Sequence, residues 1–275
     1  MTAEELLAGV VIPVDKPKQW TSFQAVNKVK SILRHTYGLK KLKIGHAGTL
    51  DPMASGLLLV CVGAATKQIM QLQQGEKEYT GTMVLGATTP CYDTEQAIDR
   101  YYPFSHITRE LIDDTRRQFI GDIQQVPPMY SAVKVNGHRA YEYARIDDPS
   151  ATIEPRTVSV TEFDITRFQP GDPETESGYL EGMDTQGTSD ATTDEQSNNQ
   201  ALPKYHAPKC DIPKGLPQAD FHITCGKGTY IRSIARDYGQ ALGSGAYLAD
   251  LRRTRIGGYT VDKAVAPSDV MTFLQ

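Results

Sequence analysis

The sequence predicts a mixed α+β fold with a largely antiparallel central sheet flanked by helices. Segments with strand and helix patterns are mingled along the 275 residues without the regular β-α-β spacing of a parallel sheet. Asn136-Gly137 also marks a tight hairpin turn, which joins antiparallel strands. A chain of this length can bury a substantial core. We therefore expect residues 1–275 to form a single domain.

The N-terminal half contains apolar runs and one clear helical repeat. Thr21 and Gln24 have the spacing of a capping box, and apolar residues then recur at helical intervals, which predicts a helix over residues 22–34. Strands are expected over residues 10–14, 57–62 and 79–86.

The C-terminal half continues the same mixture. A hairpin is expected around residues 131–137, because they end in Asn-Gly. Strands are expected over residues 158–168, 221–225 and 256–261, and helices over residues 108–119, 139–145, 231–242 and 268–274.

Residues 169–218 depart from this pattern. They are polar and acidic, then rich in Pro and Lys, so they cannot bury enough surface to offset their ordering entropy. We expect a disordered acidic insertion between two strands, and a solvated loop is favoured over a role in screening RNA. The chain carries a formal charge of −4, but residues 170–200 hold eight acidic residues and no Lys or Arg. The remainder is thus mildly basic, as in proteins that contact phosphates.

The remaining composition excludes several classes of protein. The four cysteines form no C-x-x-C pair, so neither a disulfide framework nor a metal site is expected. The acidic N-terminus lacks the features of a signal peptide, and the longest apolar run is too short to span a bilayer. We expect a cytoplasmic protein without a membrane segment.

The most informative segment is residues 45–56. It contains three glycines, His46 and Asp51, and it leads directly into an apolar run. Pro52 restricts Asp51 to extended geometry, so the carboxylate is held at a junction between a loop and a regular element. Composition alone favours an ordinary Asp-Pro turn.

The residue string resembles the TruB family of tRNA pseudouridine synthases. The family's loop reads Gly-His-x-Gly-x-Leu-Asp-Pro-x-Ala-x-Gly, and residues 45–56 match it in order. The resemblance implies a pseudouridine synthase fold, with Asp51 as the nucleophile and His46 in contact with RNA. Further family motifs match at Glu78-Tyr79-Thr80-Gly81, at Lys227-Gly228-Thr229-Tyr230-Ile231-Arg232 and at Leu251-Arg252-Arg253-Thr254.

The resemblance also assigns roles to residues in these motifs. It implies that Tyr79 stacks on the target base, that Arg232 pairs with Asp51, and that Tyr230 and Leu251 line the substrate site. Without it, a tyrosine at the start of a strand is most often core packing, and an arginine that opens a helix is most often a surface residue. An extended backbone would place Tyr230 and Arg232 on one face.

Several further residues are candidates for RNA contacts. These candidates are Lys16, Lys67, Asp93 and Arg252. The family often has a second carboxylate before the position of Asp93, where this chain has Pro90, so only Asp93 is carried over. The lysines and arginines between residues 28 and 43 fit phosphate contact and a solvated helix face equally well.

The resemblance implies isomerisation of uridine to pseudouridine at position 55 in the T loop of tRNA, on a flipped-out base and without cofactor or metal. We expect a monomer that binds the T arm of tRNA without an obligate protein partner, and no complete C-terminal PUA domain. Guide-RNA-dependent relatives such as dyskerin share the aspartate loop but need a PUA domain and partner proteins. A non-catalytic RNA-folding module and a hydrolase are also considered, and a hydrolase would need a second carboxylate near Asp51.

Overall fold

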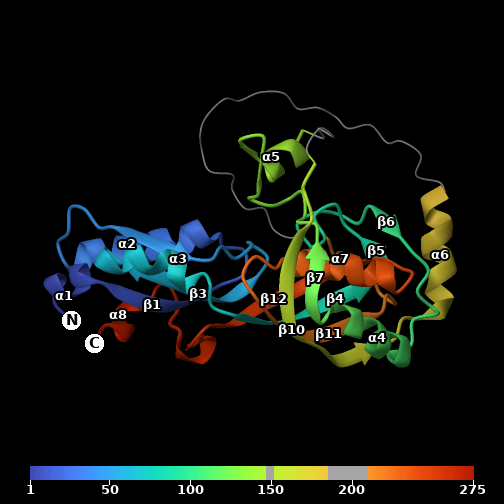
Figure 1. The fold of residues 1–275 in the computed structure, drawn as a ribbon. Coiled ribbons are helices and arrows are strands. Elements are labelled where there is room, and N and C mark those ends of the chain that lie inside the picture. Colours follow the sequence, from blue (N-terminus) through green and yellow to red (C-terminus); the bar gives the residue numbers. More distant parts are fainter. Residues whose placement is uncertain (147–151, 185–209) are drawn as a thin grey trace.

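The computed structural model describes residues 1–146, 152–184 and 210–275. It confirms the predicted mixed α+β fold, with a nine-stranded central sheet that is largely antiparallel. The main path of this sheet runs β1-β3-β12-β4-β11-β10-β7, while β2 pairs with β3 and β13 pairs with β12. The molecule is elongated, and the sheet passes through its whole length (Figure 1).

The strands of the sheet are distributed over the whole chain. They are β1 (Val10–Lys16), β2 (Ile44–Ala47), β3 (Ser55–Val62), β4 (Lys77–Leu85), β7 (Gly121–Gln125), β10 (Arg156–Gln169), β11 (Gln218–Cys225), β12 (Ala246–Ile256) and β13 (Tyr259–Thr260). Two separate small pairs are formed by β5 (Ala87–Thr88) with β6 (Arg100–Tyr101), and by β8 (Lys134–Val135) with β9 (His138–Arg139).

Most of the helices lie against the sheet or at its ends (Figure 1). The α-helices are α1 (Ala3–Ala8), α2 (Ser22–Thr36), α3 (Ile69–Leu72), α4 (Arg109–Arg116), α5 (Ala140–Ala144), α6 (Pro173–Asp184), α7 (Ile231–Ala241) and α8 (Val270–Phe273). Short 3-10 turns are η1 (Gly63–Gln68), η2 (Arg117–Phe119) and η3 (Val261–Lys263). No helix in the described ranges is both long and apolar enough to cross a membrane.

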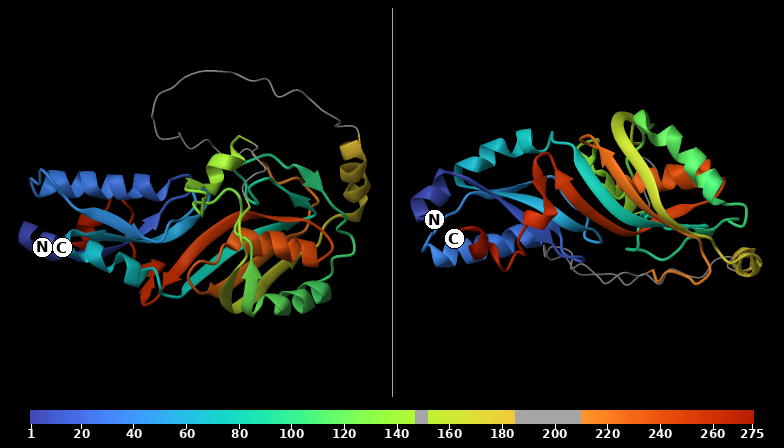
Figure 2. Two further views of the ribbon diagram at one scale, coloured as in Figure 1. Left: turned by 45° about the horizontal axis from the view of Figure 1, so that its top comes forward. Right: turned by 90° about the horizontal axis from the view of Figure 1, so that it is seen from below.

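One half of the sheet, β1, β2 and β3, packs against α2. This helix begins with the predicted capping box of Thr21 and Gln24, and its buried face carries Val26, Val29 and Leu33. These side chains belong to one core with the alternate residues Leu58, Val60 and Val62 of β3. Leu57 and Leu59 point into a smaller core on the opposite face, so β3 is buried on both sides. The termini lie together at this end, where the Met1 ammonium donates to the Leu274 carbonyl (Figure 2).

The other half, β12, β4, β11, β10 and β7, packs against α7 and α4. The apolar side of α7, with Ile234 and Tyr238, lies in the largest core of the protein. The Tyr238 hydroxyl donates to the carbonyl of Ile112 in α4, which satisfies the polar end of this buried ring.

A short parallel pairing joins the two halves. Only Arg252–Ser55 and Arg253–Gly56 pair between β12 and β3 in the described structure. Gly56 has φ +105°, and a Cβ atom there would lie 2.3 Å from the Arg253 carbonyl oxygen. A side chain at this position would therefore push the halves apart. We call this pairing the waist of the sheet.

Several expectations needed correction. The strand predicted over residues 256–261 is the short β13, whereas the central strand β12 was not predicted at all. Charged residues alternate poorly with apolar ones in β12, so it shows no clear strand period. The loop predicted from residue 45 begins as strand β2. The predicted hairpin is confirmed: Asn136 and Gly137 both have positive φ, as a type I′ turn requires.

The expectation of disorder over residues 169–218 is wrong for its first part. Pro173–Asp184 form α6, between the antiparallel partners β10 and β11. Tyr179 stacks on Tyr101 with ring centroids 4.7 Å apart and donates its hydroxyl proton to the Lys214 carbonyl. A few specific contacts thus order a segment whose overall composition is unfavourable. Residues 185–209 lie outside the described residues.

We predict that Gly56→Ala destabilises the protein by about 3 kcal/mol or more, because it adds a contact with the Arg253 backbone to the cost of positive φ. The matched control is Gly38→Ala, where φ is +63° but the added Cβ meets open space. The control should cost about 1 kcal/mol. Urea unfolding of both variants measures the difference, and equal losses would contradict the steric role of Gly56.

Candidate active site

Asp51 lies in the loop between β2 and β3, immediately before the waist. Two buried side chains fix the loop backbone. The Ser22 hydroxyl at the start of α2 accepts from the Leu50 N–H at 2.9 Å and donates to the Leu50 carbonyl at 3.0 Å. The Arg253 guanidinium donates to the carbonyls of Gly48, Thr49 and Leu57 at 3.0, 3.3 and 2.8 Å. The loop that carries Asp51 is therefore tied to both halves of the sheet.

Lys16 supports the same loop from β1. Its side chain is completely buried, and Nζ donates to the carbonyls of Pro17, Trp20 and Pro52. Burial lowers the pKa of Lys16 to about 8, although nearby Asp51 partly offsets this effect. An RNA phosphate cannot reach this ammonium group, so the expected RNA contact at Lys16 is not supported. Its position instead indicates a structural role below the loop.

Asp51 forms an ion pair with Arg232 across the waist. The Arg232 Nε atom lies 3.0 Å from Oδ2 of Asp51, and the side chains are 6% and 34% exposed, respectively. The Nε–H is not aligned for a hydrogen bond to the carboxylate, since Nε has no hydrogen-bond partner in the described residues. The attraction is therefore mainly that of the charges. A partly exposed Asp51 held in this way can still meet a substrate.

Other contacts fix the guanidinium of Arg232. It donates to the carbonyls of Cys91 and Tyr130, and it pairs with the buried carboxylate of Asp93 at 3.5 Å. Burial opposes the charge of Arg232, but the carboxylates of Asp51 and Asp93 outweigh it and raise its pKa. Asp93 is only 1% exposed, so it faces Arg232 and is not available for the RNA contact that we expected.

Glu95 is a third carboxyl group near this centre, and sequence reasoning did not identify it. Its backbone N–H donates to Oδ1 of Asp93 at 2.8 Å, while its own Oε1 is buried without a hydrogen-bond partner among the described residues. Burial, followed by the charges of Asp93 and Asp51, raises the pKa of Glu95 to about 7. Its place two residues after Asp93 is the one sequence signal that could have suggested it.

Three residues predicted for substrate binding come from neighbouring elements. Tyr79 of β4 and Leu251 of β12 are buried, and both belong to the core that includes Leu50 and Met53 of the Asp51 loop. Burial raises the pKa of Tyr79, so its phenol is neutral at physiological pH. His46 in β2 is half-buried, and burial followed by nearby Arg253 lowers its pKa, so the imidazole is neutral too.

The remaining predicted residues lie around this centre. Tyr230 is extended and caps α7, whereas Arg232 lies in the first turn of that helix, so the two do not share one strand face. The Arg156 guanidinium lies 4.8 Å from the centre of the Tyr230 ring. Arg252 pairs with Asp15 at 2.7 Å and is half-buried. Lys67 is exposed on η1.

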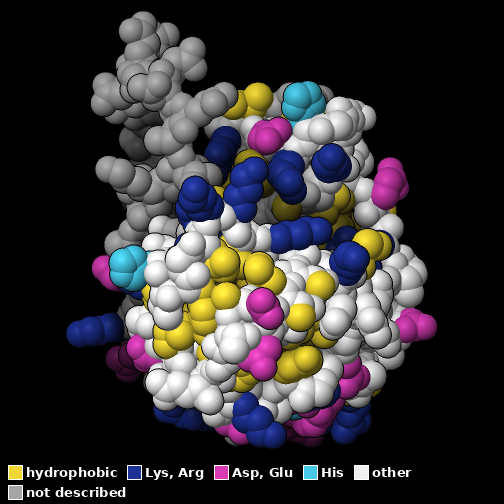
Figure 3. Space-filling view, turned by 90° about the vertical axis from the view of Figure 1, so that its left-hand side faces the viewer, with side chains coloured by type: hydrophobic (Ala, Val, Ile, Leu, Met, Phe, Trp, Pro, Cys, Tyr) yellow, Lys and Arg dark blue, Asp and Glu magenta, His cyan; other side chains and the backbone are white. Residues whose placement is uncertain are grey.

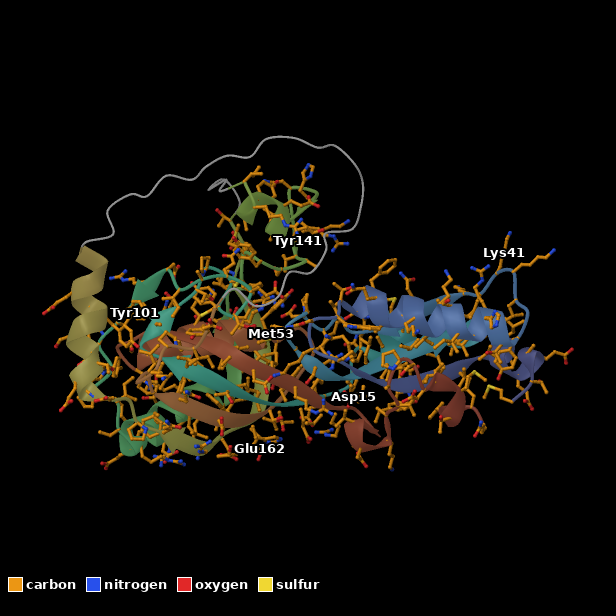
Figure 4. All side chains as sticks on the ribbon, turned by 180° about the vertical axis from the view of Figure 1, so that it is seen from behind. Asp15, Lys41, Met53, Tyr101, Tyr141 and Glu162 are labelled. Atoms are coloured by element: carbon orange, nitrogen blue, oxygen red, sulfur yellow. The ribbon has the colours of Figure 1, made fainter. Side chains whose placement is uncertain are left out.

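The active centre lies between the two ends of the molecule. Met53, two residues after Asp51, is at the middle of the structure, and the small segment with α5 and Tyr141 rises above it (Figure 4). The four cysteines are free and buried. Within the described ranges, no group of three or more His, Cys, Asp or Glu side chains could hold a metal ion. The chemistry available here is that of a carboxylate beside a fixed cation.

Solved structures with this fold include a chain of a Cbf5–Nop10–Gar1 complex. The match has a TM-score of 0.57 and 26% sequence identity, and it covers 95% of this chain and 53% of that chain. The protein therefore spans about half the length of that solved chain. The two chains share the mixed α+β fold over this length.

Sequence comparisons give the family. The model of the TruB family pseudouridylate synthase N-terminal domain matches residues 34–183, and that of the tRNA pseudouridylate synthase B C-terminal domain matches residues 232–275. The tRNA pseudouridine synthase B of Flavobacterium johnsoniae is 46% identical over 96% of both chains. That of Parabacteroides distasonis is 40% identical over 98% of this chain and 95% of its own. The chain belongs to the TruB family of pseudouridine synthases.

We predict that Glu95→Gln stabilises the protein at pH 8. A carboxyl group whose pKa rises from 4.5 to about 7 on folding opposes folding when it is ionised. This cost is absent below about pH 4.5, grows up to about pH 7 and is constant above it. The variant removes the ionisation, so we expect a gain on the order of 3 kcal/mol at pH 8.

Urea unfolding between pH 5 and pH 8 measures this gain. Glu154→Gln, which removes one carboxylate at an exposed position, is the control for the loss of a charge. A gain for Glu95→Gln that is the same at every pH would contradict the shifted ionisation.

Proposed function

We propose that the protein converts uridine to pseudouridine at position 55 in the T loop of tRNA, with Asp51 as the nucleophile. The two relatives reported above are named as tRNA pseudouridine synthases, and they match nearly the whole chain. The observation that carries the assignment of Asp51 is its ion pair with Arg232, which joins two segments that are far apart in the sequence.

The reaction breaks the N1–C1′ glycosidic bond, turns the base and forms a C5–C1′ bond. The proton on C5 leaves, N1 gains a proton, and nothing is oxidised, so the atoms balance without a cofactor. The Asp51 carboxylate attacks either C1′ of the ribose or the base, and the covalent intermediate holds the fragments together. Arg232 keeps that carboxylate in place through its charge.

The surrounding residues would hold the base outside the RNA stack. A uridine in a folded loop must be extruded before its glycosidic bond can be reached. Tyr79, with its neutral phenol, offers an aromatic ring near Asp51, and Leu251 offers an apolar wall. Neutral His46 on β2 is suited to stacking in the gap that the base leaves.

We propose that the enzyme works in the cytoplasm as a monomer.

We expect Asp51→Asn to lower the single-turnover rate at least about 10³-fold, because an amide cannot replace the nucleophilic carboxylate. Carbodiimide labelling and primer extension on an unmodified tRNA transcript would locate the product. Asp122→Asn, at an exposed position in β7, should keep full activity. Activity of Asp51→Asn near the wild-type rate would overturn the assignment. Tight tRNA binding by wild type without product would instead favour a non-catalytic RNA-folding module.

A second prediction concerns the arginine that fixes the Asp51 loop. Arg253→Lys should lower the single-turnover rate about 10–100-fold while changing the tRNA Kd less than about twofold. Three separate nitrogens of the Arg253 guanidinium each donate to a different carbonyl, and the single nitrogen of a lysine cannot reproduce their planar spacing. The control is Arg255→Lys in the same strand, where the partners are Glu76 and Glu78. A change in Kd with an unchanged rate would contradict the role of Arg253 in positioning the loop.

A further inference from the structure

The segment from α2 to the Asp51 loop has a strongly one-sided charge. Between Asp15 and Asp51 the chain contains eight Lys and Arg residues and no Asp or Glu, although the whole protein carries a formal charge of −4. Two of the eight, Lys16 and Lys18, are held by carbonyl oxygens and by Asp250, respectively. The other six are Lys28, Lys30, Arg34, Lys40, Lys41 and Lys43, which we call the α2 basic surface.

These six cations are available to a ligand. Lys30 is half-buried and the other five are exposed, and none of the six forms a salt bridge within the described part of the chain. Lys30 and Arg34 line a groove of about 470 Å³, together with polar Asn27 and Ser31. Lys and Arg side chains gather beside a hollow on this end of the molecule (Figure 3). Cations beside amide and hydroxyl donors suit phosphate oxygens.

The position of α2 links this surface to the active site. Ser22, at the start of the helix, is hydrogen-bonded to Leu50 next to Asp51. The helix has 15 residues and so extends about 22 Å away from the loop. Lys41 and Tyr141 lie on the same side of the molecule, and Met53 of the Asp51 loop lies below Tyr141, well away from Lys41 (Figure 4). The cations therefore follow a path that leads away from Asp51 over the length of several base pairs.

We propose that the α2 basic surface binds backbone phosphates of the RNA helix that flanks the target uridine. The inference rests on the proposed function, in which the target lies in a hairpin loop. Because phosphate contacts carry no base information, this surface sets affinity and orientation while the residues around Asp51 select the nucleotide. Arg34 donates only to the Leu39 carbonyl, and no carboxylate in the described residues pairs with any of the six cations. Such a cluster is unfavourable through self-repulsion, and a polyanion removes that repulsion.

The test compares two hairpin RNAs with the same T loop and with stems of about four and about ten base pairs. The variant combines Lys30→Gln, Arg34→Gln, Lys40→Gln and Lys41→Gln. The control combines Arg117→Gln, Arg167→Gln, Lys214→Gln and Lys263→Gln, which remove the same charge from exposed positions elsewhere. Kd is measured for each pair at several salt concentrations, and circular dichroism checks the fold.

We expect wild type and the control to bind the long stem at least about 10-fold more tightly than the short one at ~0.1 M salt. The α2 variant should bind both stems with nearly equal Kd, and its salt slope on the long stem should fall by about 2–3. The proposal is overturned if the α2 variant keeps the preference for the long stem, which includes the case in which its affinity falls by the same factor for both stems. It is also overturned if wild type shows no preference.

Pseudouridine formation by wild type is measured on the same hairpins. Absence of product on both RNAs would count against the proposed function, whereas the affinity comparison would still decide the role of the α2 basic surface. A loss of preference in the charge-matched control as well would show that net charge alone is responsible, and this would also overturn the proposal.

Discussion

The candidate active site depends on the contact between Arg253 and the loop that carries Asp51. In the described residues, the two halves of the sheet are joined by two residue pairs between β3 and β12, and the Arg253 side chain crosses this waist to bind three carbonyl groups on the other side. Asp51 belongs to one half, while Arg232, Asp93 and Tyr79 belong to the other. The ion pair that we assign to catalysis is therefore also an interface within the protein, and it exists only when the halves are docked.

The charges at this interface balance only in part. Arg232 faces Asp51 and Asp93, and Glu95 adds a third carboxyl group close to both. Protonation of Glu95 near neutral pH relieves the excess negative charge without breaking the pair between Arg232 and Asp51. Removing one partner of a buried ion pair typically costs about 3–5 kcal/mol. Arg232 is thus required by the fold as well as by the proposed chemistry.

Sequence reasoning predicted most elements with clear periodicity, such as α2 with its capping box and the hairpin at Asn136-Gly137. It missed β12, because the charged residues of this strand satisfy themselves through contacts that depend on the tertiary fold. Recognising β12 would have placed Arg253 on the same face as Leu251. Lys16 is a candidate for an RNA contact from the sequence, because its charge gives no sign that carbonyl groups surround it in the fold. The pairing of Arg232 with Asp51 came from family resemblance rather than from residue patterns.

The ladder between β10 and β11 continues to its last pair, Gln169–Gln218, at the end of the molecule remote from the waist. The paired strands hold the two ends of the connection between them side by side, so the connection forms a closed loop whatever its length. The entropy of loop closure grows only with the logarithm of length, and each doubling costs about 0.6 kcal/mol. This connection can therefore accept added length at little thermodynamic cost, whereas a single added methyl group at Gly56 meets the backbone of the neighbouring strand.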